Sequence, residues 1–438
     1  MTSDGGSAWS GSGDVASRQE ASTLQAGWGR CEFTPVEPVP LAGYTHLRDR
    51  MSARVRDPLF ARAVVLRQAG GPDVALVVYD LVITTEELYQ GLRKELADTG
   101  LDVVCSATHT HSASGGFWRP LLGRAFLGRF RPGALERLIE AGAMAVRDAL
   151  HNIGPVRVSS GTVLIPGLNG NRRDHHGILD EELHVLRLSR DDADAILFSY
   201  PGHPVIVAER DHLAVSGDFP GEAAVRIERQ FDFAMYLAGA LGGVDVRFPH
   251  EPVTVEENLE MMAGPIANGA VMLARSNSAE TAVDSSMPIL SRAMVELRFE
   301  KPDSCWSYDD DHRRMDWFLN RIATRLIKPV PRVARVEGIR IGPMAIIGLP
   351  ADIGIGLSMQ IKQAGKERGL ARVVTMSQTG GCIGYVHMPQ DYAVTPADEG
   401  DAITMGRYEN AMNFFGHDTG TKILQAAVTV LDRLVGGR

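Results

Sequence analysis

Residues 73–107 most constrain the fold of this chain, because they have the pattern of one complete βαβ unit. The apolar run 74–81 predicts a buried strand, and a capping box formed by Thr84 and Glu87 predicts the start of a helix. Residues 101–106 predict a second buried strand. A connection of helix length favours a parallel pairing of the two strands.

Apolar strands and amphipathic helices alternate along the rest of the chain, which predicts an α/β fold with a mixed β-sheet core flanked by helices. The further strands are expected at 183–188, 195–200, 234–237, 344–349 and 372–376, and the further helices at about 133–152, 220–230, 256–275, 353–369 and 421–435. The first 22 residues are polar and Gly/Ser-rich, so we expect a disordered N-terminal tail over 1–22. No Pro/Ser-rich linker follows, and we expect a single domain over 23–438.

The segment SATHTHSASGG (106–116) directly follows the second predicted strand and brings two histidines close together. Side chains two residues apart on a strand point to the same side, so we expect His109 and His111 to do so. Imidazole is the commonest side-chain metal ligand. A lone histidine after a strand is usually an ordinary hydrogen-bonded residue, but this pair flanked by small residues favours a metal site.

Two further motifs follow predicted strands, where the active sites of α/β proteins usually lie. His203 lies in the turn YPGHP (200–204) and offers a third imidazole. Asp352 ends the motif GLPAD (348–352), at the expected start of a helix. It is either a carboxylate ligand of the metal or a plain helix N-cap, and both interpretations stay open.

Two polar loops add candidates for binding the substrate. Tyr385 lies in the glycine-rich loop GGCIGYV (380–386). It could donate a hydrogen bond to a tetrahedral intermediate or bind a metal, and a packed aromatic explains it equally well. In GNRRDHHG (170–177), an arginine could clamp a carbonyl or carboxylate oxygen.

Composition excludes several classes of protein. The chain of 438 residues carries a net charge of −9, which argues against a nucleic-acid partner. No secretory h-region and no uninterrupted apolar stretch of membrane-spanning length is visible, so we expect a cytoplasmic protein without stable membrane insertion. The four cysteines show no CxxC spacing and are expected to be reduced thiols. The oligomeric state is not predicted.

The ordered motifs resemble those of the neutral/alkaline non-lysosomal ceramidase family, which are zinc-dependent amidases. The likeness runs from about Ala26 to Val435; it includes VVYDLV, THTHS, NRR, GHPVIV, SGDFPG, GALGGVD, LPAD, the GYV loop and RYE. The resemblance implies the fold of the family's catalytic domain and a Zn²⁺ ion held by His109, His203, Asp352 and Tyr385. It further implies catalytic positions at His111, Arg172, Tyr385 and Tyr408, of which Arg172 and Tyr408 would face the substrate.

The chain departs from the family pattern at two site positions. Asp245 stands where the family has its proposed serine, and Asp352 replaces the glutamate of a PGE motif. We also expect the chain to be without the family's signal peptide and C-terminal immunoglobulin-like domain.

We therefore expect a zinc-dependent amidohydrolase that cleaves an N-acyl bond in a small or lipid-like substrate through metal-activated water. Asp245 or His111 would be the general base, and Asp80 would orient a ligand histidine. Two alternatives stay open. The same site could condense or cyclise an acyl group with an amine in a biosynthetic pathway, or the chain could be a degenerate member that only binds its ligand.

Overall fold

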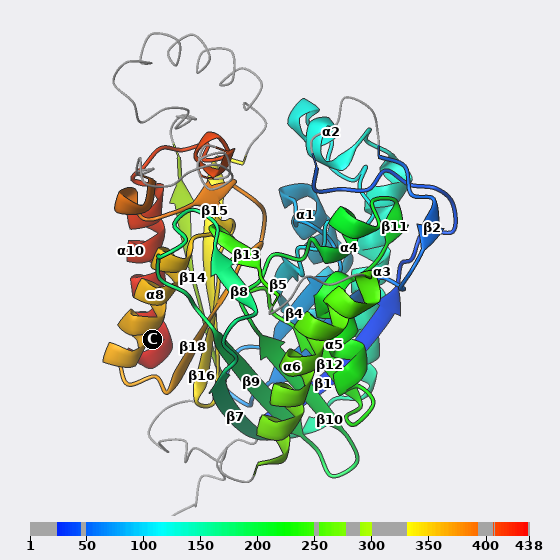
Figure 1. Ribbon diagram of the computed structural model, residues 1–438. Coiled ribbons are helices and arrows are strands. Elements are labelled where there is room, and N and C mark those ends of the chain that lie inside the picture. Colours follow the sequence, from blue (N-terminus) through cyan, green and yellow to red (C-terminus); the bar gives the residue numbers. More distant parts are fainter. Residues whose placement is uncertain are drawn as a thin grey trace, which may run out of the picture.

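Three β-sheets form the centre of the protein, and helices cover them from outside (Figure 1). The computed structural model describes residues 24–44, 50–248, 254–276, 290–299, 331–392, 406 and 408–436. The expected tail over 1–22 and Cys305 lie outside the described residues. The mixed α/β architecture predicted from the sequence is confirmed.

The first sheet has the strand order β5-β4-β3-β1-β6. Its strands are β1 (Gln25–Glu32), β3 (Phe60–Arg67), β4 (Val74–Tyr79), β5 (Asp102–Ala107) and β6 (Gly154–Pro155). β4 and β5 pair in parallel, as the βαβ pattern predicts. The connecting helix α1 (Glu86–Glu95) is capped by Thr85, whose side chain accepts from the Leu88 N–H, and not by Thr84. The Thr84 hydroxyl instead donates to the Gln378 carbonyl at 2.7 Å. Helix α3 (Pro132–His151) packs on β1 and β3.

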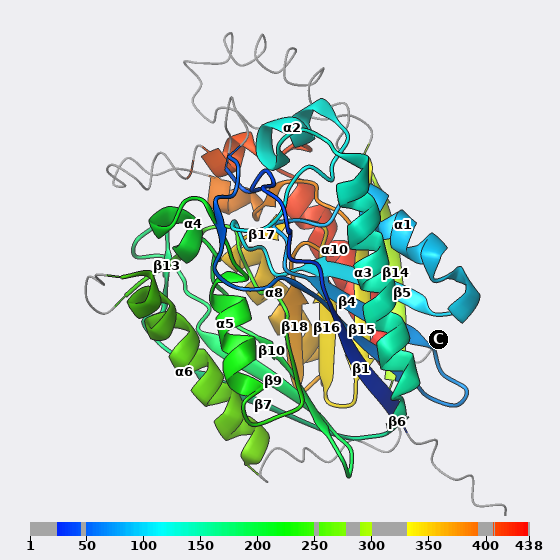
Figure 2. The same cartoon turned by 90° about the vertical axis from the view of Figure 1, so that its right-hand side faces the viewer.

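The second sheet has the order β12-β10-β9-β7, with β7 (Arg157–Leu164), β9 (Glu182–Ser189), β10 (Asp194–Ser199) and β12 (Phe233–Tyr236). Its outer face carries α5 (Asp218–Ile227) and α6 (Val255–Arg275). The third sheet has the order β14-β15-β16-β18, with β14 (Leu290–Arg298), β15 (Val333–Ile341), β16 (Met344–Gly348) and β18 (Arg372–Met376). Helices α8 (Ile355–Glu367) and α10 (Thr419–Gly436) cover it (Figures 1 and 2).

Short elements complete the described chain. The helices are η1 (Ala97–Thr99), α2 (Leu121–Leu127), α4 (Ile206–Arg210) and η4 (Pro389–Tyr392). The strands are β2 (Arg54–Val55), β8 (Asn169–Asn171), β11 (Ala214–Val215), β13 (Val244–Val246), β17 (Asp352–Ile353) and β19 (Tyr385–Val386). Among the described helices, none combines the length and the apolar character needed to cross a bilayer.

The inner faces of the three sheets share one hydrophobic core. Leu76 of the first sheet, Leu197 of the second and Ile346 of the third belong to the same buried cluster. The strands that are buried on both faces are apolar along their whole length, because helices cover the side that the neighbouring sheets do not.

Each sheet contains one parallel pair of strands, and this arrangement positions the site. The pairs are β4 with β5, β10 with β12 and β16 with β18. Hydrogen bonds join the segments that follow these pairs. The Ser106 hydroxyl donates to the Ser377 carbonyl at 2.9 Å, and the Ser377 N–H donates to the Ala238 carbonyl at 2.8 Å. The carboxyl ends of all three pairs therefore meet at one place, the position where α/β proteins build ligand sites.

Candidate metal centre and substrate cavity

Three buried histidines converge where the strand ends meet. His109 Nε2 lies 3.3 Å from His203 Nε2 and 3.3 Å from His111 Nε2. One nitrogen from each ring lies within 4.8 Å of the other two, and each residue is at least 93% buried. Three imidazole nitrogens at this spacing could hold one metal ion.

Backbone carbonyls orient two of the three rings. His109 Nδ1 lies 2.6 Å from the Val82 carbonyl oxygen, and His203 Nδ1 lies 3.3 Å from the Leu241 carbonyl oxygen. A proton on each Nδ1 leaves the Nε2 lone pair directed at the cluster, which is the arrangement that metal-binding histidines require. Asp80, expected in this orienting role, instead accepts a hydrogen bond from Arg62 at 3.1 Å.

The expected reason for the convergence of His109 and His111 is wrong. β5 ends at Ala107, so neither histidine is on the strand, and alternation of side chains along a strand does not apply. His109 has a φ of 70°, in the left-handed region that few residues other than glycine adopt. The turn at His109 brings its ring to 4.9 Å from that of His111, measured between ring centroids. Strained backbone of this kind is common at functional sites.

The electrostatic surroundings keep the three imidazoles neutral. Burial lowers the pKa of His109, and it lowers the pKa values of His111 and His203 well below the ordinary value. The Arg172 guanidinium lowers the last two pKa values further, and Arg50 adds to the lowering at His111. A neutral imidazole is the form that binds a metal, so this set of donors fits a divalent cation.

Asp352 lies beside this cluster but on the other side of His109. It belongs to β17, and α8 begins at Ile355 after Gly354, so the expected position at a helix start and the N-cap interpretation are both wrong. Asp352 Oδ1 accepts a hydrogen bond from the Gln378 amide and lies 3.6 Å from His109 Nδ1, not Nε2. Gln378, whose φ is 57°, had no motif that marked it as part of the site.

Tyr385 and Arg172 meet at the next position around the cavity. The parallel pairing of β17 with β19 sets Tyr385 opposite Asp352. Arg172 Nη2 donates to the Tyr385 hydroxyl at 3.3 Å, while Arg172 Nε donates to Glu409 Oε1 at 2.8 Å. Glu409 is fully buried and also accepts from the Gly243 N–H at 2.9 Å. The sequence analysis included Glu409 in the RYE motif but predicted no role for it.

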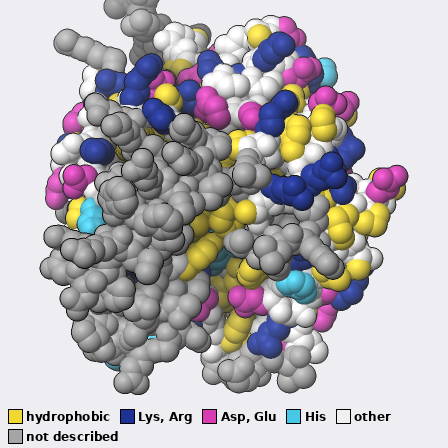
Figure 3. Space-filling view, turned by 90° about the horizontal axis from the view of Figure 1, so that it is seen from above, with side chains coloured by type: hydrophobic (Ala, Val, Ile, Leu, Met, Phe, Trp, Pro, Cys, Tyr) yellow, Lys and Arg dark blue, Asp and Glu magenta, His cyan; other side chains and the backbone are white. Residues whose placement is uncertain are grey.

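A mainly apolar cavity opens onto these groups. His109, His111, Asp352, Tyr385 and Tyr408 line its polar side. The apolar wall comprises Val82, Ile83, Trp118, Phe126, Leu127, Met412 and Phe414. Seen from the α2 end of the molecule, hydrophobic side chains gather at the middle of the face (Figure 3). The cavity can therefore receive a polar bond next to an apolar group.

Two predicted residues have different positions relative to this cavity. Tyr408 is 37% exposed, and its ring packs edge-on against Tyr385 with the centroids 5.8 Å apart. Asp245 is exposed on β13 and is not among the residues that line the cavity. Its Oδ1 accepts a hydrogen bond from the Val246 N–H at 2.9 Å. The structure therefore brings Tyr408 to the site and leaves Asp245 outside it.

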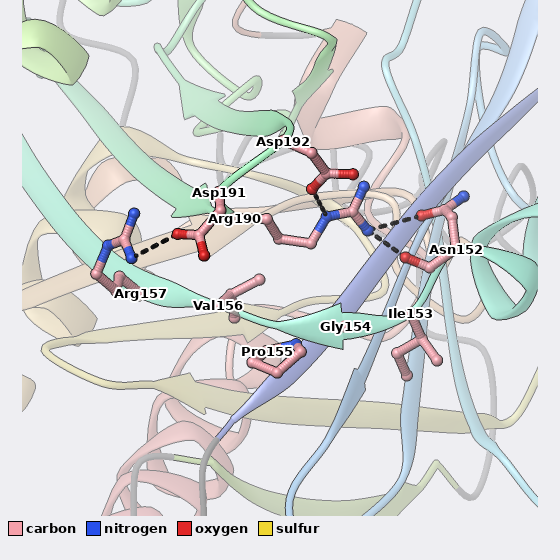
Figure 4. A pocket seen from close by; sticks show the side chains of 9 residues that line it. All are labelled: Asn152, Ile153, Gly154, Pro155, Val156, Arg157, Arg190, Asp191 and Asp192. Carbon is pink, nitrogen blue, oxygen red and sulfur yellow. Dashed lines mark hydrogen bonds and ion pairs between the residues drawn. The ribbon is translucent and has the colours of Figure 1, made fainter.

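Another cavity lies by β6, away from the α2 end of the molecule (Figures 2 and 4). Arg190 and Arg157 line it, but each pairs with an adjacent acidic side chain. Arg190 Nε lies 3.2 Å from Asp192 Oδ1, and Arg157 Nη1 lies 3.1 Å from Asp191 Oδ1. Because the arginine charges are compensated, this cavity is a weaker candidate than the one at the histidines.

Comparison with known proteins agrees with this geometry. The sequence model of the neutral/alkaline non-lysosomal ceramidase N-terminal region matches residues 24–245. Neutral ceramidase of Mycobacterium tuberculosis is 23% identical over 82% of this chain and 71% of that protein. Neutral ceramidase of Drosophila melanogaster is 26% identical over 48% of this chain and 33% of that protein.

Solved structures show the same fold. The crystal structure of neutral ceramidase from Pseudomonas aeruginosa superimposes with a TM-score of 0.74 at 18% identity, covering 95% of this chain and 75% of that one. A ceramidase complexed with C2 gives a TM-score of 0.74 at 17% identity, covering 95% of this chain and 76% of that one. The chain belongs to the neutral/alkaline non-lysosomal ceramidase family, which implies an amide hydrolase.

Proposed function

We propose that this protein is a zinc-dependent amidohydrolase that cleaves the N-acyl bond of a substrate with an apolar group. The observation that carries the proposal is the convergence of three neutral, buried imidazoles beside a mainly apolar cavity. His109, His111 and His203 would hold the ion through Nε2, leaving room in the coordination sphere for water or substrate. This assignment makes His111 a ligand, in place of the general base expected from its position in the motif.

A bound zinc ion would supply Lewis-acid polarisation of the carbonyl and a water of lowered pKa. The residues around the ion would bind the substrate and stabilise charge. Arg172 and Tyr385 would stabilise the negative charge that develops on the carbonyl oxygen. The Tyr385 hydroxyl accepts from Arg172, so its own proton is free to be donated. Burial raises the pKa of Tyr385 well above its ordinary value, which keeps that proton in place.

The apolar wall indicates that the cavity favours substrates with an apolar group. Trp118 and Phe414 are both at least 92% buried and offer large aromatic surfaces. An acyl chain or another apolar substituent would gain about 25 cal/mol for each Å² of surface that it buries there. The solved relative with a bound C2 molecule supports a lipid-like amide as the substrate. We therefore propose N-acyl compounds, either small and soluble or lipid-like.

The test is hydrolysis of a panel of N-acyl compounds by the purified protein, with product analysis by mass spectrometry and metal content by elemental analysis. We expect one zinc per chain, loss of hydrolysis after chelation, and recovery when zinc is added back. The variants His109→Ala and His203→Ala should lose both zinc and activity. Hydrolysis that survives chelation and both substitutions would contradict the proposal. Adding free amine to the assay tests the condensation alternative, which would give a new amide product.

A further inference from the structure

Residues 41–44, called the 41–44 segment below, contact the His111 side chain. Gly43 has a φ of 100°, and a Cβ atom placed on it would lie 2.4 Å from His111 Nδ1. The ring of Tyr44 approaches the His111 ring edge-on, with 5.3 Å between the centroids. His111 is therefore contacted by the backbone of Gly43 and by the ring of Tyr44, and any side chain at position 43 would displace the imidazole.

Arg50 joins the 41–44 segment to the histidine loop. Its Nη2 donates to the Ala42 carbonyl at 2.8 Å and also to the His111 carbonyl. Its guanidinium carbon lies 5.1 Å from the centroid of the Tyr44 ring, a cation–π distance. Arg50 is 5% exposed, and within the described residues its side-chain hydrogen bonds go to these two carbonyls alone, both from Nη2. The hydrogen bonds of this buried arginine therefore hold the backbone at Ala42 and the backbone at His111 together.

Further backbone hydrogen bonds fix the 41–44 segment on both sides. The Ala42 N–H donates to the carbonyl of Ala113, two residues after His111, at 3.1 Å. The Gly43 N–H donates to the Phe126 carbonyl at 3.0 Å, in α2. His109 and His203 have carbonyl partners at Nδ1, whereas His111 Nδ1 faces the backbone of Gly43. The 41–44 segment therefore stands at the ring atom of His111 where the other two rings have their carbonyl partners.

We propose that the 41–44 segment and Arg50 are positioning elements for His111, and that they set the direction of its Nε2 toward His109 and His203. The proposal rests on the metal centre proposed above. At His111 the backbone of the 41–44 segment takes the place that the Val82 and Leu241 carbonyls have at the other two histidines. Gly43 is required because its conformation is left-handed and because His111 occupies the space where a side chain would be.

The test compares Gly43→Ala with Gly70→Ala in the full chain. Gly70 also has a positive φ, of 74°, but nothing lies within 4 Å of the Cβ position there. The two variants therefore share the backbone strain and differ in the contact with His111. Zinc affinity is measured by competition with a chromophoric chelator. We expect Gly43→Ala to weaken zinc binding at least tenfold and Gly70→Ala to change it by less than twofold, as for a lost orienting partner.

A double-mutant cycle shows whether the effect passes through His111. In the His111→Ala background, Gly43→Ala should change zinc affinity by less than twofold, because the imidazole that it displaces is gone. Arg50→Met should weaken zinc binding, and Arg50→Lys, which keeps the positive charge and one donor nitrogen, should restore part of the affinity. An unchanged affinity in Gly43→Ala, or the same loss in both backgrounds, overturns the proposal.

A second measurement separates this proposal from that of the metal centre. In the metal-free protein, the ring NMR signals of His111 should shift in Gly43→Ala and stay in place in Gly70→Ala. If the wild-type protein binds no zinc, the proposed function fails, while the ring signals still decide whether the 41–44 segment positions His111. Unshifted ring signals in Gly43→Ala would overturn the positioning role.

Discussion

At the residue scale, the site is defined by which atom of each side chain is already committed to a partner. His109 and His203 use Nδ1 for backbone carbonyls and present Nε2 to the cluster. Asp352 uses Oδ1 for the Gln378 amide and approaches His109 from the Nδ1 side. This geometry supports the proposed centre of three histidines, in which Asp352 would act on His109 and not on the ion.

Metal affinities of two variants test that assignment. Asp352→Asn keeps the size of the side chain and should weaken zinc binding by roughly 10–100-fold, the usual cost of losing a partner of a ligand. His111→Ala removes a ligand nitrogen and should weaken binding by more than Asp352→Asn does. Chelator competition gives both values. A larger loss in Asp352→Asn than in His111→Ala would make the aspartate a direct ligand, as the family resemblance implies.

Asp218 gives a pH-dependent contribution to stability that is separate from the metal centre. Its carboxylate is fully buried and accepts from the Val207 N–H at 2.8 Å and the Phe219 N–H at 2.7 Å. Burial raises its pKa to about 7. The folded state therefore binds this proton more tightly than the unfolded state does, and the contribution to stability is lost as the pH rises toward 7.

The variant Asp218→Asn isolates this effect, since asparagine tolerates the φ of 55° at this position. Between about pH 4 and 7, the free energy of unfolding of the wild type should fall relative to the variant by at most about 1.4 kcal/mol per pH unit. Urea unfolding at several pH values measures the difference. Parallel curves for the two proteins would show that Asp218 does not titrate in this range.

Sequence motifs predicted the site residues that carry obvious chemistry and missed those that only hold them. His109, His111 and His203 could be predicted because imidazole is the commonest side-chain metal ligand and all three follow predicted strands. Glu409 binds Arg172, which lies 237 residues away in the sequence. Gln378 binds Asp352, which lies 26 residues away. Nothing local in a sequence marks a residue whose partner is so distant along the chain, and the same holds for Gly43 and Arg50.

At the element scale, glycines explain why some strands escaped prediction. β1 carries Gly27 and Gly29, which weaken the strand pattern. A Cβ at Gly27 would lie 2.0 Å from the Ala149 carbonyl oxygen, so the glycine exists because α3 packs closely against the strand. The buried strands β4, β5, β16 and β18 were predicted to within two residues at either end, since their continuous apolar runs need no knowledge of the neighbouring element.

The segment around α2 supplies part of the apolar wall of the cavity, and Trp118 is the largest side chain of that wall. Gly123 of α2 lies against Trp118, since a Cβ there would be 2.9 Å from the Trp118 Cβ. Replacing the indole by a smaller group should enlarge the apolar end of the cavity. We expect Trp118→Leu to raise kcat/KM for longer N-acyl chains relative to shorter ones by roughly tenfold.

Trp28→Leu is the matched control for this prediction. Trp28 is 7% exposed on β1 and packs under Arg190, away from the cavity. It loses the same volume as Trp118→Leu, so a general loss of stability would affect both variants. The preference for chain length should change only in Trp118→Leu. Rates with a series of N-acyl lengths provide the measurement, and equal profiles for the two variants would exclude Trp118 as a determinant of length.

At the scale of the whole molecule, the central core belongs to all three sheets at once. The region matched by the family's N-terminal model, residues 24–245, contains only the first two. Removing the third sheet would expose the apolar residues of the other two that now face it. We therefore expect the fragment 24–245 to be unable to fold alone.

Because the three sheets share one core, we expect the 438-residue chain to unfold in one step. Circular dichroism and tryptophan fluorescence measured against denaturant should give coincident transitions. Two separated transitions, or a folded 24–245 fragment with a cooperative melt, would show that the sheets form independent units.

The meeting of the three strand pairs has one more consequence. The first sheet supplies two of the imidazoles, the second supplies the third, and the aspartate and its amide partner follow strands of the last. A folding intermediate in which only one or two of the sheets had formed could not bring all of these side chains together. Tight binding of the proposed metal ion would therefore require all three sheets to be in place, and it would report that folding is complete.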